Sequence, residues 1–422
     1  MNFKPVNISP TPVVILDCDF RSQEGILQSF GSRKIPIIGL SADPTCPAFH
    51  SRYLTHKIVS PRLDDGFERY IEFLLNLPHR GVLIYSNDVS TVVISKYREE
   101  LQSEGYLLNV PDLRTVEKVF DKLECYNLAK SVDVPVARTE LVNSRNEVRE
   151  IWDKFRKPVI LKGTRMAGGA YKRINRLEEV DMAWEEVGRL IRSKEYQARD
   201  SRIILQEWLH YSMTDIWHCE TVYSSKSEPI GFFTIKKIRG SLNDDGTYSS
   251  RIFAGEYVEA PALTEMVERL LSTVKWQGFA NVDLVYISSE DKFYLTEVNP
   301  RLPGFSYYPS KAGFEMAYYY YADLTGIEYQ KPNGFSRSIY FETFRFPGDL
   351  SEGIRYILKG QLHVSPFLRS YARLVNKNLV KVIEPIKWDD MGFTLHTQVR
   401  NAREFLRKTV GYLGRRMKKF LT

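Results

Sequence analysis

The stretch YLTEVNPRLPG, Tyr294–Gly304, is predicted to be a strand that runs into a tight loop. On a strand, alternate side chains share one face at about 6.6 Å spacing, so Glu297, Asn299 and Arg301 should point the same way and Val298 the other way. A solvent-facing strand edge gives the same alternation. Carboxylate and amide oxygens, however, are the ligands that a hard cation such as Mg²⁺ prefers, and a guanidinium binds phosphate or carboxylate oxygens. The combination favours a metal site with a phosphate beside it.

A second carboxylate is expected at the same place. The segment ANVDLVY puts Asp283 on a strand that a short turn joins to the strand of Glu297. Antiparallel pairing would then bring the two carboxylates opposite each other. Like charges at about 4 Å cost several kcal/mol at an effective dielectric near 20, and a cation between them removes that cost. We therefore predict Asp283, Glu297 and Asn299 as metal ligands.

Two segments have features of a nucleotide site. In GTRMAGGAY, Gly163, Gly168 and Gly169 allow backbone N–H groups to approach an anion, although a hairpin tip would look the same. Lys162 precedes this loop and could reach phosphate, as could Lys122 on an earlier helix, but surface lysines are usually only solvated charges.

The other segment is LQEWL, 205–209, at the end of an apolar strand. An extended backbone there could pair with an adenine edge. Glu207 could accept a hydrogen bond from the exocyclic amine, and Trp208 and Leu209 could flank the ring. An ordinary edge strand is the alternative.

Near the N-terminus, strands alternate with helices, which predicts a parallel, doubly wound sheet. The first loop has no GxGxxG sequence, so no dinucleotide site is expected. Loops at the carboxyl ends of such strands bind ligands, and here they contain Ser22, Gln23, Asn87 and Asp88. Turn and helix-cap chemistry is an equal alternative for these four residues.

Composition limits the class of protein. A chain of 422 residues has room for two or three domains. Its four cysteines lie far apart and have neither zinc nor redox spacing, which indicates a reduced, cytoplasmic protein. We find no apolar run of membrane-spanning length and no secretory signal.

The net charge of +7 is concentrated at the C-terminus. From Arg400 onward there are eight Lys or Arg and one acid, Glu404, which together equal the whole excess. Apolar residues in this tail repeat at steps of 4, 3, 4 and 3, as on one helical face: Leu406, Val410, Leu413, Met417 and Phe420. A basic amphipathic helix suits an anionic membrane surface. Docking on the protein's own core or on a partner remains the alternative, since Gly411 and Gly414 each weaken an isolated helix by about 1 kcal/mol.

Together, these motifs resemble the ATP-grasp superfamily of carboxylate–amine ligases. The order along the chain is DK at 121–122, KPVILK with its glycine loop, QEWL, KKIR, an Asp-bearing strand and EVNPR. The segments PAFHSRYLTHKIVSP, 47–61, and KWDDMGF, 387–393, resemble a narrower group that includes D-aspartate ligase-like enzymes. The resemblance implies an N-terminal α/β domain at 1–115, two α+β subdomains that clasp ATP at 116–210 and 211–335, and a C-terminal extension with a basic helical tail at 336–422.

The resemblance also implies roles for single residues. It assigns Arg239 and Arg301 to stabilising the transferred phosphoryl group, and Asp283, Glu297 and Asn299 to Mg²⁺, for which Mn²⁺ could substitute. It assigns a larger set to ATP: Lys122, Lys162, Gly168, Gly169, Gln206, Glu207, Trp208, Leu209 and Asp215, the last at the ribose. The first-domain residues Ser22, Gln23 and Asp88 are the candidates for substrate selection.

The implied reaction forms an amide or peptide bond through an acyl phosphate, with an amino acid, a peptide or a cell-envelope precursor among the candidate substrates. An inactive ATP-binding scaffold or regulatory protein with the same fold is the alternative. Small-molecule substrates are expected as partners and nucleic acid is not, because no basic and aromatic platform is evident outside the tail. The resemblance leaves room for a homodimer and for a peripheral position at the inner face of a membrane.

Overall fold

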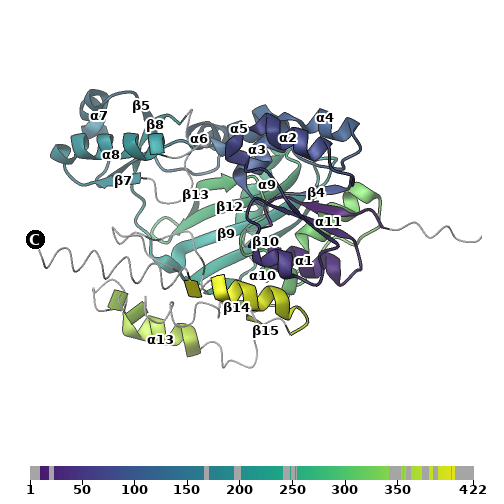
Figure 1. Cartoon of the computed structure of the whole chain (residues 1–422). Coiled ribbons are helices and arrows are strands. Elements are labelled where there is room, and N and C mark those ends of the chain that lie inside the picture. The colour runs from purple at the N-terminus through teal and green to yellow at the C-terminus, as the bar shows by residue number, and fades with distance from the viewer. Residues whose placement is uncertain are drawn as a thin grey trace, which may run out of the picture.

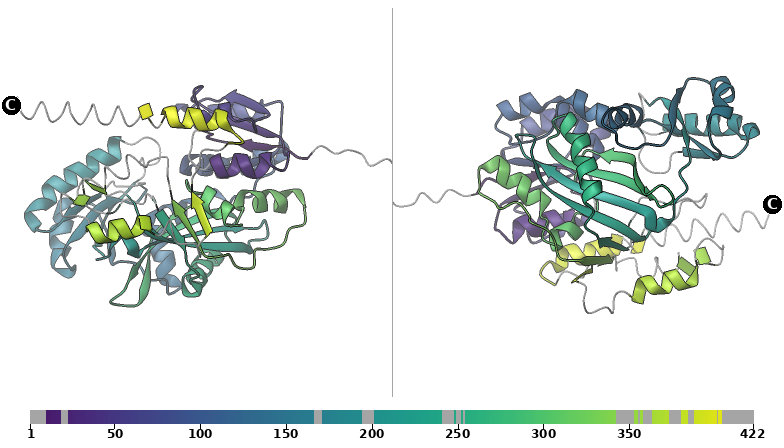
Figure 2. Two further views of the ribbon diagram at one scale, coloured as in Figure 1. Left: turned by 90° about the horizontal axis from the view of Figure 1, so that it is seen from below. Right: turned by 180° about the vertical axis from the view of Figure 1, so that it is seen from behind.

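The structure is a computed structural model of the chain. It describes residues 10–18, 23–165, 171–193, 201–240, 248, 252, 254–341, 353–354, 356–357, 363–372, 380–383, 388–400 and 402–403. Figures 1 and 2 show an N-terminal α/β unit, a small lobe and a large sheet, with the C-terminal segments beneath them.

The N-terminal unit is built on a parallel four-stranded sheet in the order β3-β2-β1-β4, as the alternation of strands and helices predicts. Apolar residues fill β1, β2 and β4, which are fully buried, whereas the edge strand β3 is mostly exposed and its sequence gave no strand signal. The strands are β1 (Val13–Ile15), β2 (Ile37–Ser41), β3 (His56–Val59) and β4 (Val82–Ile84), and the helices are α1 (Gln23–Gly31), α2 (Phe67–Leu75), α3 (Asp88–Lys96) and α4 (Arg98–Ser103), with short 3-10 turns at Pro47–His50 and Leu63–Asp65.

Two helices lead into the small lobe. The sequence from 119 to 137 favours a single helix that ends before Pro135, but the structure has two, α5 (Leu113–Phe120) and α6 (Lys122–Ser131). The break occurs at Asp121, whose carboxylate accepts hydrogen bonds from the N–H groups of Leu123 and Glu124 and so caps a new helix. This cap fixes Lys122 at the first helical position.

The small lobe is an antiparallel sheet in the order β5-β8-β6-β7, packed against two helices. Figure 1 shows it beside the large sheet, with α7 and α8 on its outer side. The predicted strands on either side of the glycine loop are both present and pair with each other. The elements are β5 (Thr139–Val142), α7 (Arg145–Ile151), β6 (Val159–Gly163), β7 (Tyr171–Ile174), α8 (Val180–Ser193) and β8 (Ile203–Glu207), with 3-10 turns at Trp152–Lys154 and Leu177–Glu179.

The large sheet has seven strands in the order β13-β12-β9-β10-β11-β14-β15. Its interior strand β9 was not predicted, because it is buried on both faces and its sequence IWHCETVY mixes polar and apolar residues. The strands are β9 (Ile216–Tyr223), β10 (Pro229–Arg239), β11 (Ala254–Tyr257), β12 (Gly278–Ile287), β13 (Lys292–Asn299), β14 (Ser338–Phe341) and β15 (Val380–Ile383).

The two faces of this sheet have different environments. Helix α9 (Pro261–Thr273) packs against one face, where Val282 and Val298 lie in its hydrophobic cluster. The other face carries the polar side chains of β9, β12 and β13 and continues into the core shared with the N-terminal unit. Val298 therefore faces away from Glu297 and Asn299, as predicted.

Helices α10 (Tyr307–Lys311) and α11 (Met316–Thr325) join the large sheet to the N-terminal unit. Helix α11 contains the run Tyr318–Tyr321, in which the rings of Tyr320 and Tyr321 are buried in the core. Helix α13 (Val364–Ala372) and a helical segment at 391–400 follow. None of the helices in these described parts is long and apolar enough to cross a membrane. All four cysteines lie in described parts of the chain, where they are buried and form no disulfide.

The C-terminal segment returns to the N-terminal unit. Asp390 is buried, and its carboxylate accepts hydrogen bonds from the Ser51 hydroxyl at 2.5 Å and the Arg52 N–H at 3.0 Å. The neighbouring Asp389 accepts one from the Tyr53 hydroxyl at 2.5 Å. The two segments that suggested a narrower resemblance, 47–61 and 387–393, are therefore in direct contact. Figure 2 shows the helical segment that follows Asp390 lying against the N-terminal unit.

Candidate active site

The centre of the candidate site is a row of polar side chains across three neighbouring strands. Asp283 of β12 lies opposite Glu297 of β13, as the turn length predicted, and opposite His218 of β9 on its other side. The His218 Nδ1 lies 2.8 Å from a carboxylate oxygen of Asp283. Burial, with the negative charge of Asp283 adding to it, raises the pKa of Glu297, and Lys122 opposes this effect.

Two lysines, Lys122, which is buried, and Lys162, which is partly buried, lie beside these carboxylates. The Lys122 Nζ is 3.4 Å from a Glu297 oxygen. From the small lobe, the Lys162 Nζ donates to the Tyr126 hydroxyl at 3.2 Å, and that hydroxyl donates to the Thr296 carbonyl of β13 at 2.6 Å. Burial, together with the charge of Lys122, lowers the pKa of Lys162. Cations from α6 and β6 thus meet carboxylates of the large sheet, and a buried and a partly buried lysine side by side are a good site for an anion.

A second row runs parallel to the first, one step nearer the end of β13. Asn299 lies opposite Asn281, which lies opposite Glu220. All three side chains are buried. The Asn299 Nδ2 donates to Asn281 Oδ1 at 2.9 Å, and the Asn281 Nδ2 donates to Glu220 Oε1 at 2.6 Å.

Arg301 lies beyond the end of β13 rather than on it, since the strand ends at Asn299. Its side chain nevertheless returns to the site, where Nη2 is 3.4 Å from Asn299 Oδ1. Its Nε donates to Asp88 Oδ1 at 2.9 Å. Asp88 is the first residue of α3, so this ion pair joins the site to the N-terminal unit. The structure brings together Arg301 and Asp88, which the sequence assigned to different functions.

The motif KKIR contributes two buried cations from β10. Lys237 is fully buried, and desolvation lowers its pKa to about 7, while Asp283 acts in the opposite direction. Arg239 lies at the end of the strand, with its guanidinium 4.2 Å from the ring centre of Tyr371 in α13. Its assignment to the phosphoryl group remains a prediction.

The predicted adenine segment lies at the end of β8, in the small lobe. Gln206 is buried and donates to the Thr139 hydroxyl at 2.7 Å, and a Glu207 oxygen accepts from the Arg156 N–H at 3.0 Å. The Trp208 ring stacks at 5.9 Å on Tyr211, and Leu209 packs with Ile216 of the large sheet. This segment therefore joins the small lobe to the large sheet, and its contact with adenine remains a prediction.

Other predicted residues have local structural contacts. Asp215 accepts hydrogen bonds from the Ser212 N–H at 2.8 Å and hydroxyl at 2.7 Å, as part of a 3-10 turn at Met213–Asp215. Asn87 caps α3 by accepting from the Val89 N–H, as the helix-cap alternative proposes. Buried Gln23 donates to the Asp17 carbonyl at 3.0 Å, and its Oε1 has no partner in the described structure. Three further predicted site residues lie outside the described residues: Ser22, Gly168 and Gly169.

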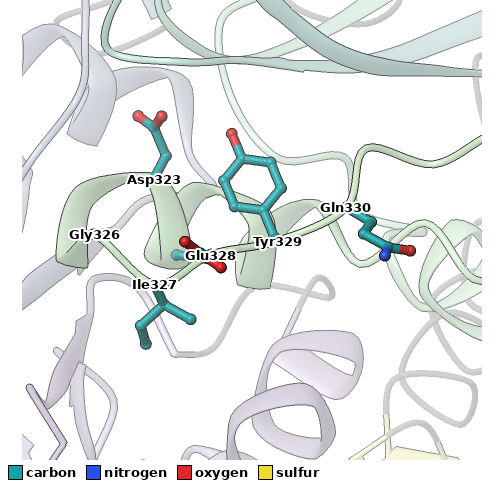
Figure 3. A pocket seen from close by; sticks show the side chains of 7 residues that line it. Asp323, Gly326, Ile327, Glu328, Tyr329 and Gln330 are labelled. Carbon is teal, nitrogen blue, oxygen red and sulfur yellow. The ribbon is translucent and has the colours of Figure 1, made fainter.

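Cavities and acidic clusters elsewhere do not compete with this site. In the described part of the chain, no group of three His, Cys, Asp or Glu side chains is arranged for a metal; the predicted ligand set includes Asn299 and is thus of another kind. Figure 3 shows an open pocket of about 640 Å³ at the end of α11, lined by Asp323, Glu328, Tyr329 and others. None of the predicted site residues lines it.

Sequence reasoning missed several members of the cluster: His218, Glu220, Lys237, Asn281 and Tyr126. Four of them were detectable, because each shares an i, i+2 polar pair on its strand: His218 with Glu220, Asn281 with Asp283, and Lys237 with Arg239. Pairs of this kind on several strands indicate a polar face inside a buried sheet. Tyr126 has no comparable signal, because its hydroxyl is placed by the packing of α6 against β13.

Similar proteins were found by sequence and by structure. The chain is 25% identical over 221 residues to urea amidolyase of Lachancea kluyveri, a match that covers 49% of this chain and 11% of that protein. It is 23% identical over 297 residues to D-aspartate ligase of Enterococcus faecium (strain Aus0004), covering 64% of this chain and 69% of that protein. No family model matches the chain.

Solved structures match over most of the chain. The N5-carboxyaminoimidazole synthetase of Staphylococcus aureus superposes with a TM-score of 0.57 at 14% identity, over 80% of this chain and 83% of that one. The biotin carboxylase domain of Hydrogenobacter thermophilus 2-oxoglutarate carboxylase, a dimer in complex with MgADP and bicarbonate, gives 0.63 at 12% identity, over 78% and 73%. Both neighbours are ATP-grasp enzymes.

The chain has the ATP-grasp fold. This confirms the predicted fold class, with a parallel N-terminal sheet followed by the antiparallel sheets of the ATP-grasp region. In this ATP-grasp chain, β14 and β15 extend the large sheet beyond residue 335. The domain limits at 115, 210 and 335 remain a prediction.

Proposed function

We propose that this chain is an ATP-dependent carboxylate–amine ligase. The observation that carries the proposal is the meeting of Lys122 and Lys162 with the paired carboxylates Asp283 and Glu297, where the small lobe adjoins the large sheet. In an ATP-grasp fold, cations there would bind phosphate oxygens, and the carboxylates would hold the accompanying metal.

The donor set fits magnesium. Asp283 and Glu297 face each other in register and Asn299 lies one step away, so two carboxylates and one amide offer oxygen ligands of the kind Mg²⁺ binds. The raised pKa of Glu297 reflects an environment that disfavours its charge. We assign the ion to these three residues, with Mn²⁺ as a substitute, and it would neutralise charge on the phosphates of ATP.

The chemistry needs positioned charges more than reactive side chains. A substrate carboxylate oxygen attacks the γ-phosphorus, the bond from that phosphorus to the bridging oxygen breaks, and ADP leaves. The amine nitrogen then attacks the acyl carbon of the acyl phosphate, inorganic phosphate leaves, and the nitrogen loses a proton. Lys122 and Lys162 would hold the phosphates of ATP, and Arg301 would face the transferred group.

The substrates are not fixed by the fold. The two similar sequences and the two solved structures are named for different substrates. We propose an amino acid, a peptide or a cell-envelope precursor, on the basis of the sequence match to D-aspartate ligase. Assembly as a homodimer is a further proposal, supported by the dimer of the biotin carboxylase domain.

The decisive test replaces a proposed metal ligand and keeps its shape. Glu297→Gln should reduce ADP formation at least a hundredfold in a screen of carboxylate and amine pairs, because the metal-binding charge is lost while the fold is kept. The matched control is Glu290→Gln, which changes an exposed carboxylate in the turn between β12 and β13 and should retain activity. Nucleotide binding by the unaltered chain without ADP formation would instead favour the inactive scaffold.

We also propose a peripheral contact with an anionic membrane. The apolar stripe of the tail can be traced upstream through Ala402 to Val399 and Leu395, again at helical spacing. Leu395 and Val399 are about half exposed, at 56% and 48%, instead of packing on the protein's own core. The basic residues from Arg400 onward would add about 1 kcal/mol each near an anionic surface.

Vesicle flotation tests this contact. The full chain should float with vesicles containing phosphatidylserine and not with neutral ones, and a chain ending at Arg403 should not float with either. Equal flotation of both chains would contradict the assignment to the tail. Self-association of the full chain without flotation would show that the stripe binds a second copy.

A further inference from the structure

Glu220 is a buried acid at the end of a three-residue hydrogen-bond chain. Its side chain is 0% exposed, and it lies on β9, two strands away from Asn299 of the predicted metal site. One carboxylate oxygen accepts from Asn281, and the other has no partner in the described part of the chain. Asn281 in turn contacts Asn299, the amide in the predicted ligand set.

The hydrogen bonds from Asn299 through Asn281 to Glu220 all run in one direction, from donor to acceptor. A side-chain amide has one donor end and one acceptor end. Because the Asn281 Nδ2 donates to Glu220, its Oδ1 is the end that remains to accept from Asn299. The Asn299 Nδ2 is thereby occupied, and its Oδ1 is turned toward Arg301, 3.4 Å from Nη2.

The opposite orientation of Asn299 would serve the site poorly. Its NH₂ group would then face the guanidinium of Arg301, donor against donor, and no amide oxygen would be available to a cation. The carboxylate oxygen of Glu220 fixes the orientation of the Asn281 amide, and Asn281 in turn fixes the orientation of the Asn299 amide. A purely structural polar contact between strands is the alternative explanation.

Burying a carboxyl group at this position is costly. Desolvation raises the pKa of Glu220 well above its ordinary value, with the charge of Asp283 adding to the effect. An apolar side chain would avoid that cost, since buried polar groups are often replaceable by well-packed hydrophobic ones. A buried carboxyl group at position 220 is therefore explained if the oxygen that accepts from Asn281 has a function at the predicted metal site.

We propose that Glu220 is a positioning residue which, through Asn281, sets the amide of Asn299 so that its oxygen faces the metal. The inference rests on the proposed function, because it gives the Asn299 oxygen a cation to bind. It goes beyond that function by assigning a role to two residues that do not themselves reach the metal.

The test compares three variants. Glu220→Met removes the acceptor and keeps most of the volume. Glu220→Gln keeps an oxygen that can accept from Asn281 and serves as the conservative rescue. Thr221→Val is the matched control, because it removes a hydrogen bond of another buried residue of β9, from the Thr221 hydroxyl to the Gly231 carbonyl at 2.8 Å, on the opposite face of the sheet.

The readout is binding of Mn²⁺ in the presence of ADP, measured from the electron paramagnetic resonance signal of free Mn²⁺. Glu220→Met should raise the dissociation constant about tenfold, the value of one hydrogen bond of about 1.4 kcal/mol, whereas Glu220→Gln and Thr221→Val should stay within twofold of the unaltered chain. Thermal unfolding records the stability of each variant.

The possible outcomes separate the inference from the function beneath it. Unchanged Mn²⁺ affinity in Glu220→Met, with reduced stability like that of Thr221→Val, would overturn the inference and leave Glu220 as a structural residue. A tenfold loss in Glu220→Gln as well would also overturn it, since the acceptor is retained there. Absence of ADP-dependent Mn²⁺ binding by the unaltered chain would overturn the proposed function itself.

Discussion

At the scale of the single residue, the central feature is Lys162, a partly buried cation that lies next to a second cation, Lys122. Burial and the neighbouring Lys122 both disfavour its charge, so its pKa is lowered in the ligand-free protein. Bound phosphate would favour that charge and raise the pKa again. Nucleotide binding should therefore be coupled to the uptake of a proton by Lys162.

This link predicts proton uptake on ATP binding. Above the lowered pKa, the ligand-free side chain is neutral and must gain a proton to pair with phosphate, so affinity should fall as pH rises. Calorimetry at pH 8 in two buffers of different ionisation enthalpy measures the protons taken up. Lys162→Met should show less uptake and weaker binding by about 1.5–3 kcal/mol, the contribution of a charged hydrogen bond. Unchanged affinity in that variant would mean that Lys162 is structural.

The sign for stability is opposite to that for ATP affinity. A lysine whose pKa is lower in the folded than in the unfolded chain binds fewer protons when folded, so unfolding becomes less favourable as pH rises between the two values. Lys237, with its pKa near 7, acts in the same direction.

The register of Asp283 against Glu297 could be predicted at this scale, because a short turn between two strands fixes which residues face each other. His218 and Lys237 could not be placed from sequence, since β9 and β10 are brought beside β12 only by the order of strands in the sheet. Local sequence does not contain that order. The positions of Asp283, Glu297 and Asn299 can therefore be predicted from neighbouring sequence. The positions of His218 and Lys237 beside them cannot.

At the scale of the element, the start of β12 is held against the N-terminal unit without room for a side chain. Gly278 has a positive φ of 71°, and an added Cβ would overlap the Tyr85 hydroxyl and the Asn109 carbonyl oxygen. The Tyr85 hydroxyl donates to that same carbonyl at 3.1 Å. The glycine lets β12 begin directly beneath this pair.

A comparison of Gly278 with Gly326, both with φ near 70°, distinguishes the cost of backbone strain from the cost of steric crowding. Gly326 also has a φ of 70°, but an added Cβ there meets nothing within 4 Å. Gly326→Ala should cost about 1 kcal/mol, the penalty for a left-handed residue. Gly278→Ala should cost about 2 kcal/mol more, as overpacking does. Denaturant unfolding measures both, and equal losses would show that the crowding at Gly278 is relieved by small movements.

Most elements could be predicted because their hydrophobic pattern repeats with the period of a helix or a strand. Helix α1 is an example, because its apolar residues Ile26, Leu27 and Phe30 fall at helical spacing and all three are buried. The failures have physical causes: β3 is an exposed edge strand, β9 is buried on both faces, and the break between α5 and α6 depends on one capping aspartate.

At the scale of the whole molecule, residues 389–390 bind the C-terminal segment to the N-terminal unit through hydrogen bonds. Asp390 is 2% exposed and accepts two hydrogen bonds from Ser51 and Arg52. An added Cβ on the neighbouring Gly392 would overlap the His50 carbonyl oxygen. The contact is therefore close as well as polar.

Removing the contact between Asp390 and the N-terminal unit should lower the free energy of unfolding of the chain. Asp390→Ala leaves the buried Ser51 hydroxyl and the partly buried Arg52 N–H without their acceptor, which should cost about 1–3 kcal/mol of unfolding free energy. Asp389→Ala is the matched control, because Asp389 is exposed and the hydrogen bond that its carboxylate accepts from the Tyr53 hydroxyl should contribute much less. Urea unfolding followed by fluorescence gives both values. Equal effects would indicate that burial of Asp390 is unimportant.

The ATP-grasp fold could be predicted at this scale because its motifs occur in a fixed order along the chain. The pairing of 47–61 with 387–393 could not, although both segments were noticed. Each looks like an independent motif in sequence, and only the folded chain brings them together.

The same contact has a consequence for how the protein is made. The N-terminal unit leaves the ribosome first, yet the partner of Ser51 and Arg52 is encoded 338 to 339 residues later. At about 5–20 residues per second of translation, tens of seconds pass before Asp390 is available. During that interval this surface must stay uncovered, so a chaperone that binds nascent chains should associate with ribosome-bound fragments ending before residue 388 and be released from those that extend beyond it.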